Sequence, residues 1–415
     1  MLRFVTPLFL SLVTLVSAQQ PVLVTPPVPA APVPAPARPV LRALPLGGDD
    51  DINSKPLPAD IGEGGQAVVP AQPAPAPVKP ALPPAPQATP IETVSPPSPI
   101  NIKPVGDDAV RLQIFLDEAK FGPGIIDGRP GQFTDLAVQS WNEVQGHPLT
   151  DWTGVNTAAR KAVPHPFAVA LVPEFSKDWV DPSLPATDRA KQALKKRMSY
   201  RSTAEFMAER YHCDIPYLIT LNSAKKINNL KPRDSIVVPN VTPFQVEALT
   251  ETGFKEDPAL SLRHAVVDTK INQVRIFESA PPALAVPEPG TVAVNTVRAN
   301  RGLVASFPIT PGKPKFIKFG TWELRNMVQL PWWRYDKSLL ETGKRSSEAL
   351  NIPAGPNSPV GVIWCGTSKS GIGMHGTSDP ETIGRARSAG CIRLANWDAI
   401  RLPTLLRPGA TVEIR

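Results

Sequence analysis

The sequence predicts a multidomain α+β protein with a β-rich C-terminal domain. The chain has 415 residues, and about 310 remain after an apolar start and a proline-rich segment are set aside, more than one core usually spans. Two short segments, 108–150 and 196–242, combine helical spacing with turn signals. From residue 260 to residue 415, alternating apolar residues indicate strands separated by loops rich in Pro and Gly.

Residues 1–18 have the pattern of a secretory signal peptide. Met1-Leu2-Arg3 is a short positive start, residues 4–16 are mostly apolar, and residues 16–18 supply small side chains for cleavage. The alternative is a membrane anchor, but the apolar run is shorter than the roughly 20 residues that span a bilayer. We therefore expect secretion across an inner membrane to the periplasm or cell wall, and no transmembrane segment in the mature chain.

Residues 19–107 are expected to form a disordered tether. Residues 21–104 hold 24 of the 52 prolines, mixed with Ala and Val and almost no aromatics. Such a segment cannot bury enough apolar surface to offset its ordering entropy. Its reach, between about 50 Å as a coil and about 260 Å as polyproline II, would carry a domain across a cell-envelope gap. Docking of proline-recognition modules is the alternative.

Residues 108–150 are expected to form a small helical module. Leu112, Leu116 and Ala119 recur at helical spacing, a turn follows at 125–128 with the sequence Ile-Ile-Asp-Gly, and Thr134 is expected to cap a second helix. Residues 151–195 are expected to be a linker.

Residues 196–242 give a second small module. A capping box, Ser202 with Glu205, opens a helix through Tyr211, and Asp214 starts another that ends near residue 222. Residues 235–239, Ser-Ile-Val-Val-Pro, then indicate a strand.

The domain from 260 to 415 begins with a strand hairpin. Residues 265–268 and 273–277 are two strands joined across a Lys-Ile-Asn turn, and residues 412–414 alternate as a closing strand. The stretch after Ser279, rich in Ala, Pro and Val, is expected to be an exposed loop.

Near the end of the chain, a histidine and a cysteine have the composition of an acyl-transfer site. Cys391 is the expected nucleophile, and because a free thiol is only a few per cent thiolate at neutral pH, it needs a base such as His375. Gly390 would let backbone N–H groups approach a developing oxyanion and permit a positive φ. A lone His and Cys are more often packing residues, but here the pattern around them is long.

Further residues complete this expected site. Ser388 could orient an imidazole, Gly376 lies beside the base, and Arg393 would project to the same side of an extended segment as Cys391 and hold an anionic group. Among four aromatic residues that could either wall a substrate groove or pack in the core, Trp333 and Trp364 are the candidates for the groove.

The remaining cysteines and the histidines suggest no metal site. Cys213 and Cys365 could form a disulfide in an oxidising compartment, but two buried free thiols are favoured because their separation cannot be judged from sequence. The other histidines have no ligand-like spacing with the cysteines, so no metal and no cofactor are expected. The net charge of +7 is spread over the chain, which indicates mild attraction to anionic envelope polymers and no nucleic-acid partner.

The C-terminal motifs resemble those of the L,D-transpeptidase family with a YkuD-type catalytic domain. His375-Gly376-Thr377, Ile383-Gly384 and the segment 388–393, Ser-Ala-Gly-Cys-Ile-Arg, occur in the family's order, and the resemblance extends over about residues 262–415. It implies a β-rich fold in which Cys391 attacks the amide between the third and fourth residues of a peptidoglycan stem peptide. The chain departs from many members at Ala389, where they have a histidine.

The two small modules also resemble known families. Segment 108–150 resembles a helical peptidoglycan-binding domain because of its Ile-Asp-Gly turn, and segment 196–242 resembles the βααβ fold of LysM, which binds glycans. The Gly-Asp usual near the first LysM turn is replaced by Arg201-Ser202. A structural spacer is the alternative for the second module.

These resemblances imply a secreted peptidoglycan L,D-transpeptidase, a cysteine acyltransferase. It would form an acyl-enzyme on a stem tetrapeptide, release D-alanine and pass the acyl group to an amine, either another stem peptide, giving a 3→3 cross-link, or a wall-attached protein. One alternative is an L,D-carboxypeptidase with water as acceptor. Another is a non-catalytic scaffold that binds the cell wall.

Overall fold

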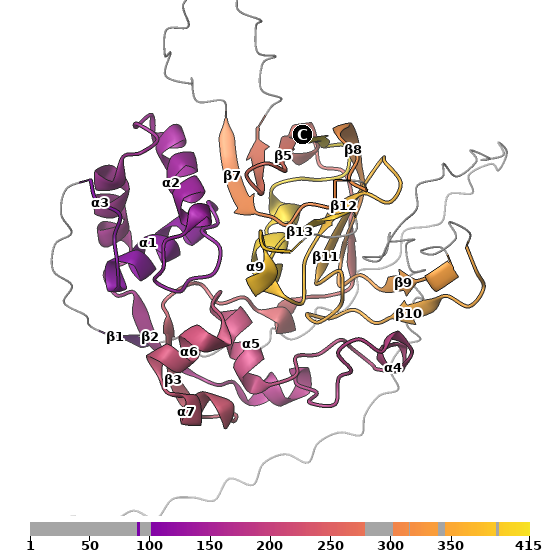
Figure 1. The fold of residues 1–415 in the computed structure, drawn as a ribbon, viewed down its shortest axis with the longest axis horizontal. Helices are drawn as coiled ribbons and strands as arrows, with labels where there is room; N and C mark the ends of the chain where they lie inside the picture. Colours follow the sequence, from indigo (N-terminus) through magenta and orange to yellow (C-terminus); the bar gives the residue numbers. More distant parts are fainter. Residues whose placement is uncertain (1–88, 92–100, 279–301, 315, 339–344, 387–389) are drawn as a thin grey trace, which may run out of the picture. The chain divides into compact units, whose positions relative to one another are not determined.

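The computed structural model describes residues 89–91, 101–278, 302–314, 316–338, 345–386 and 390–415, all within one compact unit, Ala43–Arg415 (Figure 1). The expected signal peptide, most of the expected tether and the expected loop after Ser279 lie outside these residues. In the part described, no helix has the length and apolar character needed to cross a membrane.

Among the described residues, nine strands form the C-terminal sheet. Eight follow in the order β13-β12-β11-β8-β14-β5-β6-β7, and β4 pairs with β8 outside this path. Their bounds are β4 Thr252–Phe254, β5 His264–Asp268, β6 Gln273–Phe277, β7 Leu303–Pro308, β8 Gly320–Gln329, β11 Ile363–Thr367, β12 Gly373–His375, β13 Ile392–Arg393 and β14 Thr411–Ile414. Because β4 belongs to this sheet, the sheet begins upstream of residue 260.

The expected hairpin and closing strand are confirmed. β5 and β6 pair antiparallel, and Asn272 in their turn has a φ of 56°, a conformation that Asn tolerates better than most residues. β14 lies between β5 and β8. Val412 and Ile414 of β14 are buried in the core, whereas Thr411 and Glu413 are partly exposed, which is the alternation of a strand with one apolar face.

Three helices form the α1–α3 bundle. They are α1 Asp107–Glu118, α2 Gln132–Gln145 and α3 Trp152–Ala162, and their apolar core includes Leu112, Leu116, Trp141 and Val155. Figure 1 shows them as the indigo and violet group.

The expected start of α2 is wrong. The residue before the helix is Gly131, not Thr134, and the buried Thr134 hydroxyl donates to the carbonyl of Pro123 at 3.5 Å. The hydroxyl therefore fixes the preceding loop and does not cap the helix.

The segment 151–195, expected as a linker, contains regular structure. Asp151 caps α3 by accepting hydrogen bonds from the N–H groups of Thr153 and Gly154. β2 spans Phe167–Leu171, and α4 spans Arg189–Ala193. Only Val155, Asn156 and Ala159 of α3 are buried, so its apolar period is too weak to stand out in the sequence.

The helix, helix and strand expected between 202 and 239 are present. Ser202 and Glu205 form the capping box of α5 Thr203–Arg210, and Asp214 caps α6 Ile215–Leu221. A short α7, Ala224–Asn228, leads to β3, Ser235–Pro239.

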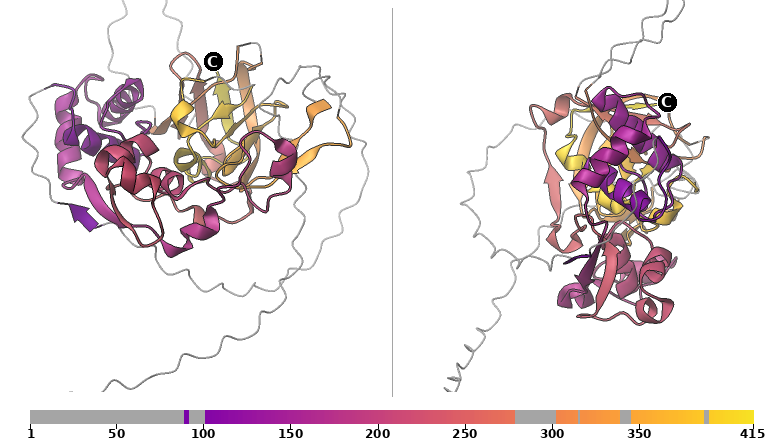
Figure 2. Two further views of the ribbon diagram at one scale, coloured as in Figure 1. Left: turned by 60° about the horizontal axis from the view of Figure 1, so that its bottom comes forward. Right: turned by 90° about the vertical axis from the view of Figure 1, so that its left-hand side faces the viewer.

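The strand partner of β3 comes from outside the expected module. β3 pairs antiparallel with β2, and β2 pairs with β1, Thr89–Ile91, which lies in the expected tether. The tether therefore contains a strand: pairing with β2 satisfies backbone groups there without needing an apolar core of its own. The unit β2, α5, α6, α7 and β3 is here called the middle module; its kinship to LysM stays a prediction. Figure 2 gives two further views of these elements.

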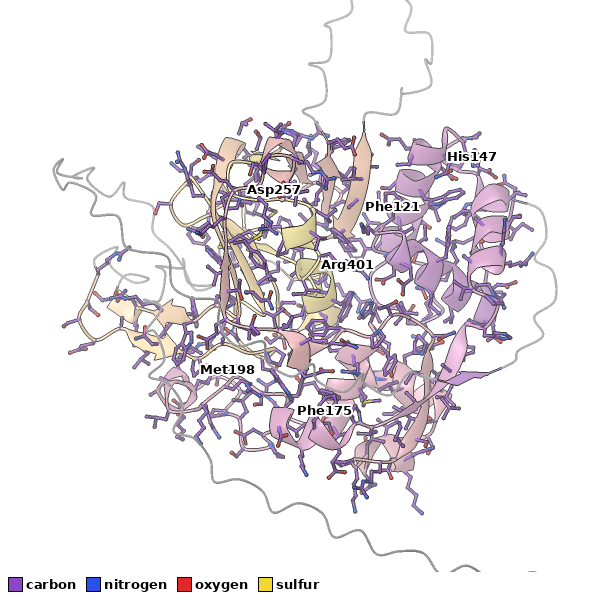
Figure 3. The ribbon with its side chains drawn as sticks, turned by 180° about the vertical axis from the view of Figure 1, so that it is seen from behind. Phe121, His147, Phe175, Met198, Asp257 and Arg401 are labelled. Carbon is purple, nitrogen blue, oxygen red and sulfur yellow. The ribbon has the colours of Figure 1, made fainter. Side chains whose placement is uncertain are left out.

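A buried carboxylate links the α1–α3 bundle, the middle module and the C-terminal sheet. Asp117 at the end of α1 is 0% exposed; it accepts from Arg401 Nη2 and lies 3.1 Å from Nδ1 of His212, while Arg401 Nη1 also donates to the Asp117 carbonyl at 3.0 Å. Arg401 is labelled in Figure 3. Burial alone would raise the pKa of Asp117, but the charges of Arg401 and His212 hold it below its usual range.

We expect Asp117→Ala to lower the free energy of unfolding by about 3 to 5 kcal/mol, because it leaves a buried cation without its partner. Urea unfolding followed by circular dichroism measures the change. The control is Glu174→Gln, which removes an exposed carboxylate paired with Lys177 and should leave the urea midpoint unchanged. An Asp117→Ala midpoint equal to that of the control would contradict the role given to this cluster.

Candidate active site

The expected base lies on a strand, and the expected nucleophile directly precedes the neighbouring strand. β12 and β13 run parallel, with Met374 opposite Ile392 and His375 opposite Arg393. Because side chains alternate along a strand, His375 and Arg393 share a face. Cys391 directly precedes β13, and its projection to the same face stays a prediction. The register brings His375 and Arg393 together, while the roles of His375, Cys391 and Arg393 stay predictions.

The hydrogen bond at His375 determines which ring nitrogen can act as base. Nδ1 lies 2.6 Å from the carbonyl oxygen of Gly376. A carbonyl oxygen only accepts, so Nδ1 carries the proton and Nε2 keeps its lone pair. The imidazole is 1% exposed and stacks on the indole of Trp364, with ring centroids 5.8 Å apart and an angle of 25° between the planes.

Glycines make room for the indole that holds the imidazole. A Cβ on Gly373 would lie 2.7 Å from the ring of Trp364, and a Cβ on Gly366 would lie 2.9 Å from its Nε1. Nε1 donates to Oδ1 of Asn326 at 3.1 Å. Trp364, expected to line a substrate groove, therefore also positions the base.

Cys391, the expected nucleophile, lies in an apolar cluster. The Cys391 thiol, in a residue that is 3% exposed, donates to the carbonyl of Gly371 at 3.7 Å. The cluster around it, here called the apolar cover, contains Leu184, Met198, Trp333, Ile352, Val360 and Trp364. Two of its members come from the segment that precedes α5, far upstream of the catalytic motif.

Short strands and an aromatic contact hold this cover. β9, Trp333–Tyr335, pairs antiparallel with β10, Leu350–Ile352. The guanidinium of Arg189 in α4 lies 4.9 Å from the ring centroid of Trp333, a cation–π contact. Trp333, the other expected groove residue, is 0% exposed, so it packs in the cover.

Asn396, which the sequence reasoning missed, fixes the backbone that enters β11, the neighbour of the strand that holds His375. Its Oδ1 accepts from the N–H of Val362 at 3.1 Å, and its Nδ2 donates to Glu209 at 2.9 Å and to the carbonyl of Pro356 at 3.1 Å. A Cβ on Gly376 would lie 2.1 Å from Asn396 Oδ1. Gly376 is therefore a glycine for a packing reason, and its carbonyl orients the base.

Glu209 extends this support to α5. It accepts from the hydroxyl of Tyr200 as well as from Asn396. Burial raises the pKa of Glu209 to about 8, and the charge of Glu205 adds to the effect, while the two hydrogen bonds oppose it. In the sequence, the only signal for this buried polar network is Asn396 within an apolar run, and that signal is weak.

The backbone around the nucleophile is anchored by residues 310–312. Thr310 and Arg393 exchange both backbone hydrogen bonds, and the Thr310 hydroxyl accepts from the N–H of Gly384 at 2.8 Å. A Cβ on Gly312 would lie 2.6 Å from Cα of Gly390. At Gly390 itself, an added Cβ would meet nothing closer than 3.7 Å. Of these two positions, only residue 312 must therefore be a glycine to avoid a steric clash.

The other expected site residues and cysteines can now be placed. Ser388 lies outside the described residues, as does Ala389, so the role of Ser388 stays a prediction. Cys213 and Cys365 are free and buried, and burial raises the pKa of both thiols above the usual range. Within the described ranges, no three His, Cys, Asp or Glu residues converge as a metal site.

Residues 292–414 match the family model described as the L,D-transpeptidase catalytic domain, YkuD. This segment is a YkuD-type L,D-transpeptidase catalytic domain. It contains His375, Cys391 and the strands that position them. The match leaves out β4, β5 and β6, which belong to the same sheet.

Sequence relatives agree with this assignment. The YkuD proteins of Bacillus licheniformis and Bacillus subtilis, to which an L,D-transpeptidase activity is assigned provisionally, are 37% and 38% identical to this chain over 78 residues. Each match covers 19% of this chain and 47% or 48% of the relative. The chain thus spans about half the length of the curated relatives it matches.

Solved L,D-transpeptidases align with part of the chain. One from Mycobacterium smegmatis has 16% identity and a TM-score of 0.26 and covers 37% of this chain and 58% of its own. L,D-transpeptidase 3 from Mycobacterium tuberculosis has 16% identity and a TM-score of 0.25 and covers 45% and 76%. TM-scores of this size support no argument from superposition.

The raised pKa of Glu209 predicts a pH-dependent stability for this protein. Its folded pKa of about 8 exceeds the ordinary 4.5, so its contribution is full below about pH 4.5 and is lost as the pH rises through 8. We expect Glu209→Gln to flatten the decline in unfolding free energy between about pH 5 and 8, measured by urea titrations. Part of the slope should remain, because burial also raises the pKa of Asp398 to about 8.

The control for this experiment is Glu251→Gln, which changes an exposed glutamate and should leave the slope as it is. An unchanged slope in Glu209→Gln would contradict the assignment of this carboxyl.

The two glycines near the nucleophile should respond differently to the same substitution. We expect Gly312→Ala to destabilise the fold by about 1 to 3 kcal/mol, because its methyl group would overlap the backbone of Gly390. The Gly312→Ala substitution should also slow the alkylation of Cys391 by iodoacetamide, and peptide mass spectrometry measures that rate. Gly390→Ala should keep the melting temperature. Equal effects of the two substitutions would argue against this packing.

Proposed function

We propose that this chain is a peptidoglycan L,D-transpeptidase that works through an acyl-enzyme on Cys391. The supporting observation is the arrangement around Trp364: His375 stacks on this indole, which belongs to the same buried cluster as Cys391, and the Gly376 carbonyl leaves Nε2 of His375 as the basic nitrogen. The substrate is a stem tetrapeptide whose fourth residue is D-alanine.

In the first half-reaction, His375 Nε2 takes the proton of the thiol. The sulfur attacks the carbonyl carbon of the third residue and forms a tetrahedral intermediate. The C–N bond to D-alanine then breaks, the amine leaves with the proton held by the imidazole, and a thioester on Cys391 remains. Backbone N–H groups around Gly390 are the proposed donors to the oxyanion.

In the second half-reaction, the amine of an acceptor attacks the thioester carbonyl. His375 Nε2 takes a proton from the attacking amine, the new amide forms, and the thiol is regenerated with that proton. We propose another stem peptide, which gives a 3→3 cross-link, or a wall-attached protein as acceptor. Arg393, on the same face as His375, is the proposed partner for a carboxylate of the substrate.

Substrate must reach a sulfur that is 3% exposed. Opening of the apolar cover is therefore part of the proposed cycle. Closure over bound substrate would exclude water, which favours an amine acceptor over hydrolysis. Secretion to the periplasm or cell wall, where the polymer lies, completes the proposal; its basis is the pattern of residues 1–18.

Mass spectrometry of muropeptides tests this function. Mature protein incubated with disaccharide-tetrapeptide should yield dimers with loss of D-alanine, and the stalled protein should carry a mass increase on Cys391. Both products should disappear in Cys391→Ala, and His375→Ala should lower turnover by about a hundredfold or more, the usual contribution of a general base.

A matched control is Cys365→Ala, because this thiol is buried and has no proposed part in the chemistry. Tripeptide monomers without dimers would instead assign the carboxypeptidase reaction. Unchanged substrate with a folded protein, across both proposed acceptors, would contradict the enzyme and favour a wall-binding scaffold.

A further inference from the structure

A pocket of about 290 Å³ lies where the α1–α3 bundle, the middle module and the C-terminal domain meet. The turn at 125–128 and Phe133 contribute from the bundle, and Asp214 contributes from the start of α6. The C-terminal domain supplies residues 380–385 and α9, Asn396–Ala399. One pocket is therefore lined by two features that the sequence analysis identified in the small modules. They are the Ile-Asp-Gly turn and the helix cap at Asp214.

Two buried polar groups on the pocket wall lack hydrogen bonds. Trp397 and Asp398 are each 1% exposed, and both line the pocket. Among the described residues, Nε1 of Trp397 and Oδ1 of Asp398 have no hydrogen-bond partner. Oδ1 lies 3.6 Å from Nη1 of Arg401, an ion-pair distance that is too long for a hydrogen bond. An unsatisfied donor and acceptor side by side in a pocket wall are costly unless something fills them.

One face of the Trp397 indole is covered by a neighbouring ring. Its ring stacks on His212, with centroids 5.3 Å apart and planes at 9°. His212 is in turn fixed by the buried Asp117. The donor at Nε1 is thus presented by a rigid support, which favours binding because little entropy is lost.

Carboxylates predominate on the rest of the wall. Asp127 accepts from Gln113 and from the Arg129 N–H through Oδ1, and Asp214 accepts from the Tyr217 N–H through Oδ1. These contacts use only one oxygen of each carboxylate, so the second oxygen of Asp127 and of Asp214 can accept from a ligand. Glu381 and Asp398 add two more, and the basic residues lining the pocket are Arg129 and Arg385.

The electrostatics of the empty pocket indicate that a cation is favoured there. Burial raises the pKa of Glu381, and the charges of Asp379 and Asp214 raise it further. Burial also raises the pKa of Asp398 to about 8, and the charge of Asp117 adds to this, against the opposing effect of Arg401. A ligand ammonium group near these carboxyls would stabilise their charged forms.

We propose that this pocket binds a ligand that carries both a primary ammonium group and a carboxylate, as an amino acid or a peptide with a free amine does. The ammonium group lies toward the carboxylates of Asp214 and Asp398. The ligand carboxylate accepts from Trp397 Nε1 and pairs with Arg129 or Arg385. Phe133 and Ile125 cover the intervening carbons. This is a binding site separate from the acyl-transfer chemistry, and it does not require Cys391.

Isothermal titration calorimetry on the intact mature chain tests the proposal with three small probes. 6-Aminohexanoate has both charged groups, pentylamine has only the ammonium group, and hexanoate has only the carboxylate. We expect 6-aminohexanoate to bind with a dissociation constant of about a millimolar or below, the range open to so small a ligand. Each single-charge probe should bind at least about tenfold more weakly.

Two variants locate the binding site. Asp398→Asn and Asp214→Asn each remove one charge at nearly constant shape, and Asn also preserves a helix cap at position 214. Each should weaken 6-aminohexanoate at least about tenfold. Asp151→Asn is the matched control, because Asp151 also caps a helix but does not line the pocket; it should bind like the parent chain. Cys391→Ala should bind normally too, which separates this test from that of the acyl transfer.

Absence of heat with 6-aminohexanoate, equal binding of hexanoate, or unchanged affinity in both charge variants would overturn the proposal. The source of the ligand is distinguished in a second arm. Co-sedimentation with insoluble peptidoglycan that is lost when its amines are acetylated, or when 6-aminohexanoate competes, assigns the site to wall peptides. If neither acetylation nor 6-aminohexanoate changes the sedimentation, while 6-aminohexanoate still binds in the calorimeter, the site is assigned to free amino acids.

Discussion

The carboxylate of Asp117 is the interaction on which much of this structure depends. It comes from the end of α1, and its partners are His212 of the middle module and Arg401 of the C-terminal domain; the side chains of Asp117 and His212 are buried, and that of Arg401 is partly buried. Such a cluster is stabilising only when every partner is in place. The Asp117 carboxylate, which none of these parts could bury alone, therefore fixes the α1–α3 bundle and the middle module to the C-terminal domain. Asp117 also holds His212, and the ring of His212 supports Trp397.

The short helix α9 connects the region around Asp117 to the candidate active site. Asn396 accepts from the N–H of Val362, directly before β11, while Trp397 and Asp398, the next two residues, line the pocket between the modules. All four residues of α9 are buried. A helix of one turn buries side chains in every direction only when neighbours surround it, so its geometry is set by tertiary contacts and not by helix propensity.

Local patterns predicted the parts of the structure that local physics determines. The capping box at Ser202, the hairpin across Asn272 and the strand with Val412 and Ile414 depend on neighbours in sequence, and the structure has all three. The expected catalytic pair, His375 and Cys391, was chosen from motif order alone, which needs no knowledge of the fold, and its role stays a prediction. Asn396 and Gly312 were missed because their roles arise from segments distant in sequence. The pairing of β3 with β2 was missed for the same reason, since a long segment separates the two strands.

Gly355 illustrates how closely the catalytic segment is fitted to the chain before it. Its φ is 147°, and a Cβ there would lie 2.4 Å from the carbonyl oxygen of Met198, a residue of the apolar cover. The Met198 N–H also donates to the Ala354 carbonyl at 3.0 Å. A glycine at this position makes sense only when the upstream segment is docked. The segment that contains Gly355 is thus shaped to fit the upstream segment that contains Met198. If this segment were fused to unrelated N-terminal modules, the Cys391 thiol would lose part of its apolar cover, and the glycine at position 355 would no longer be required for packing.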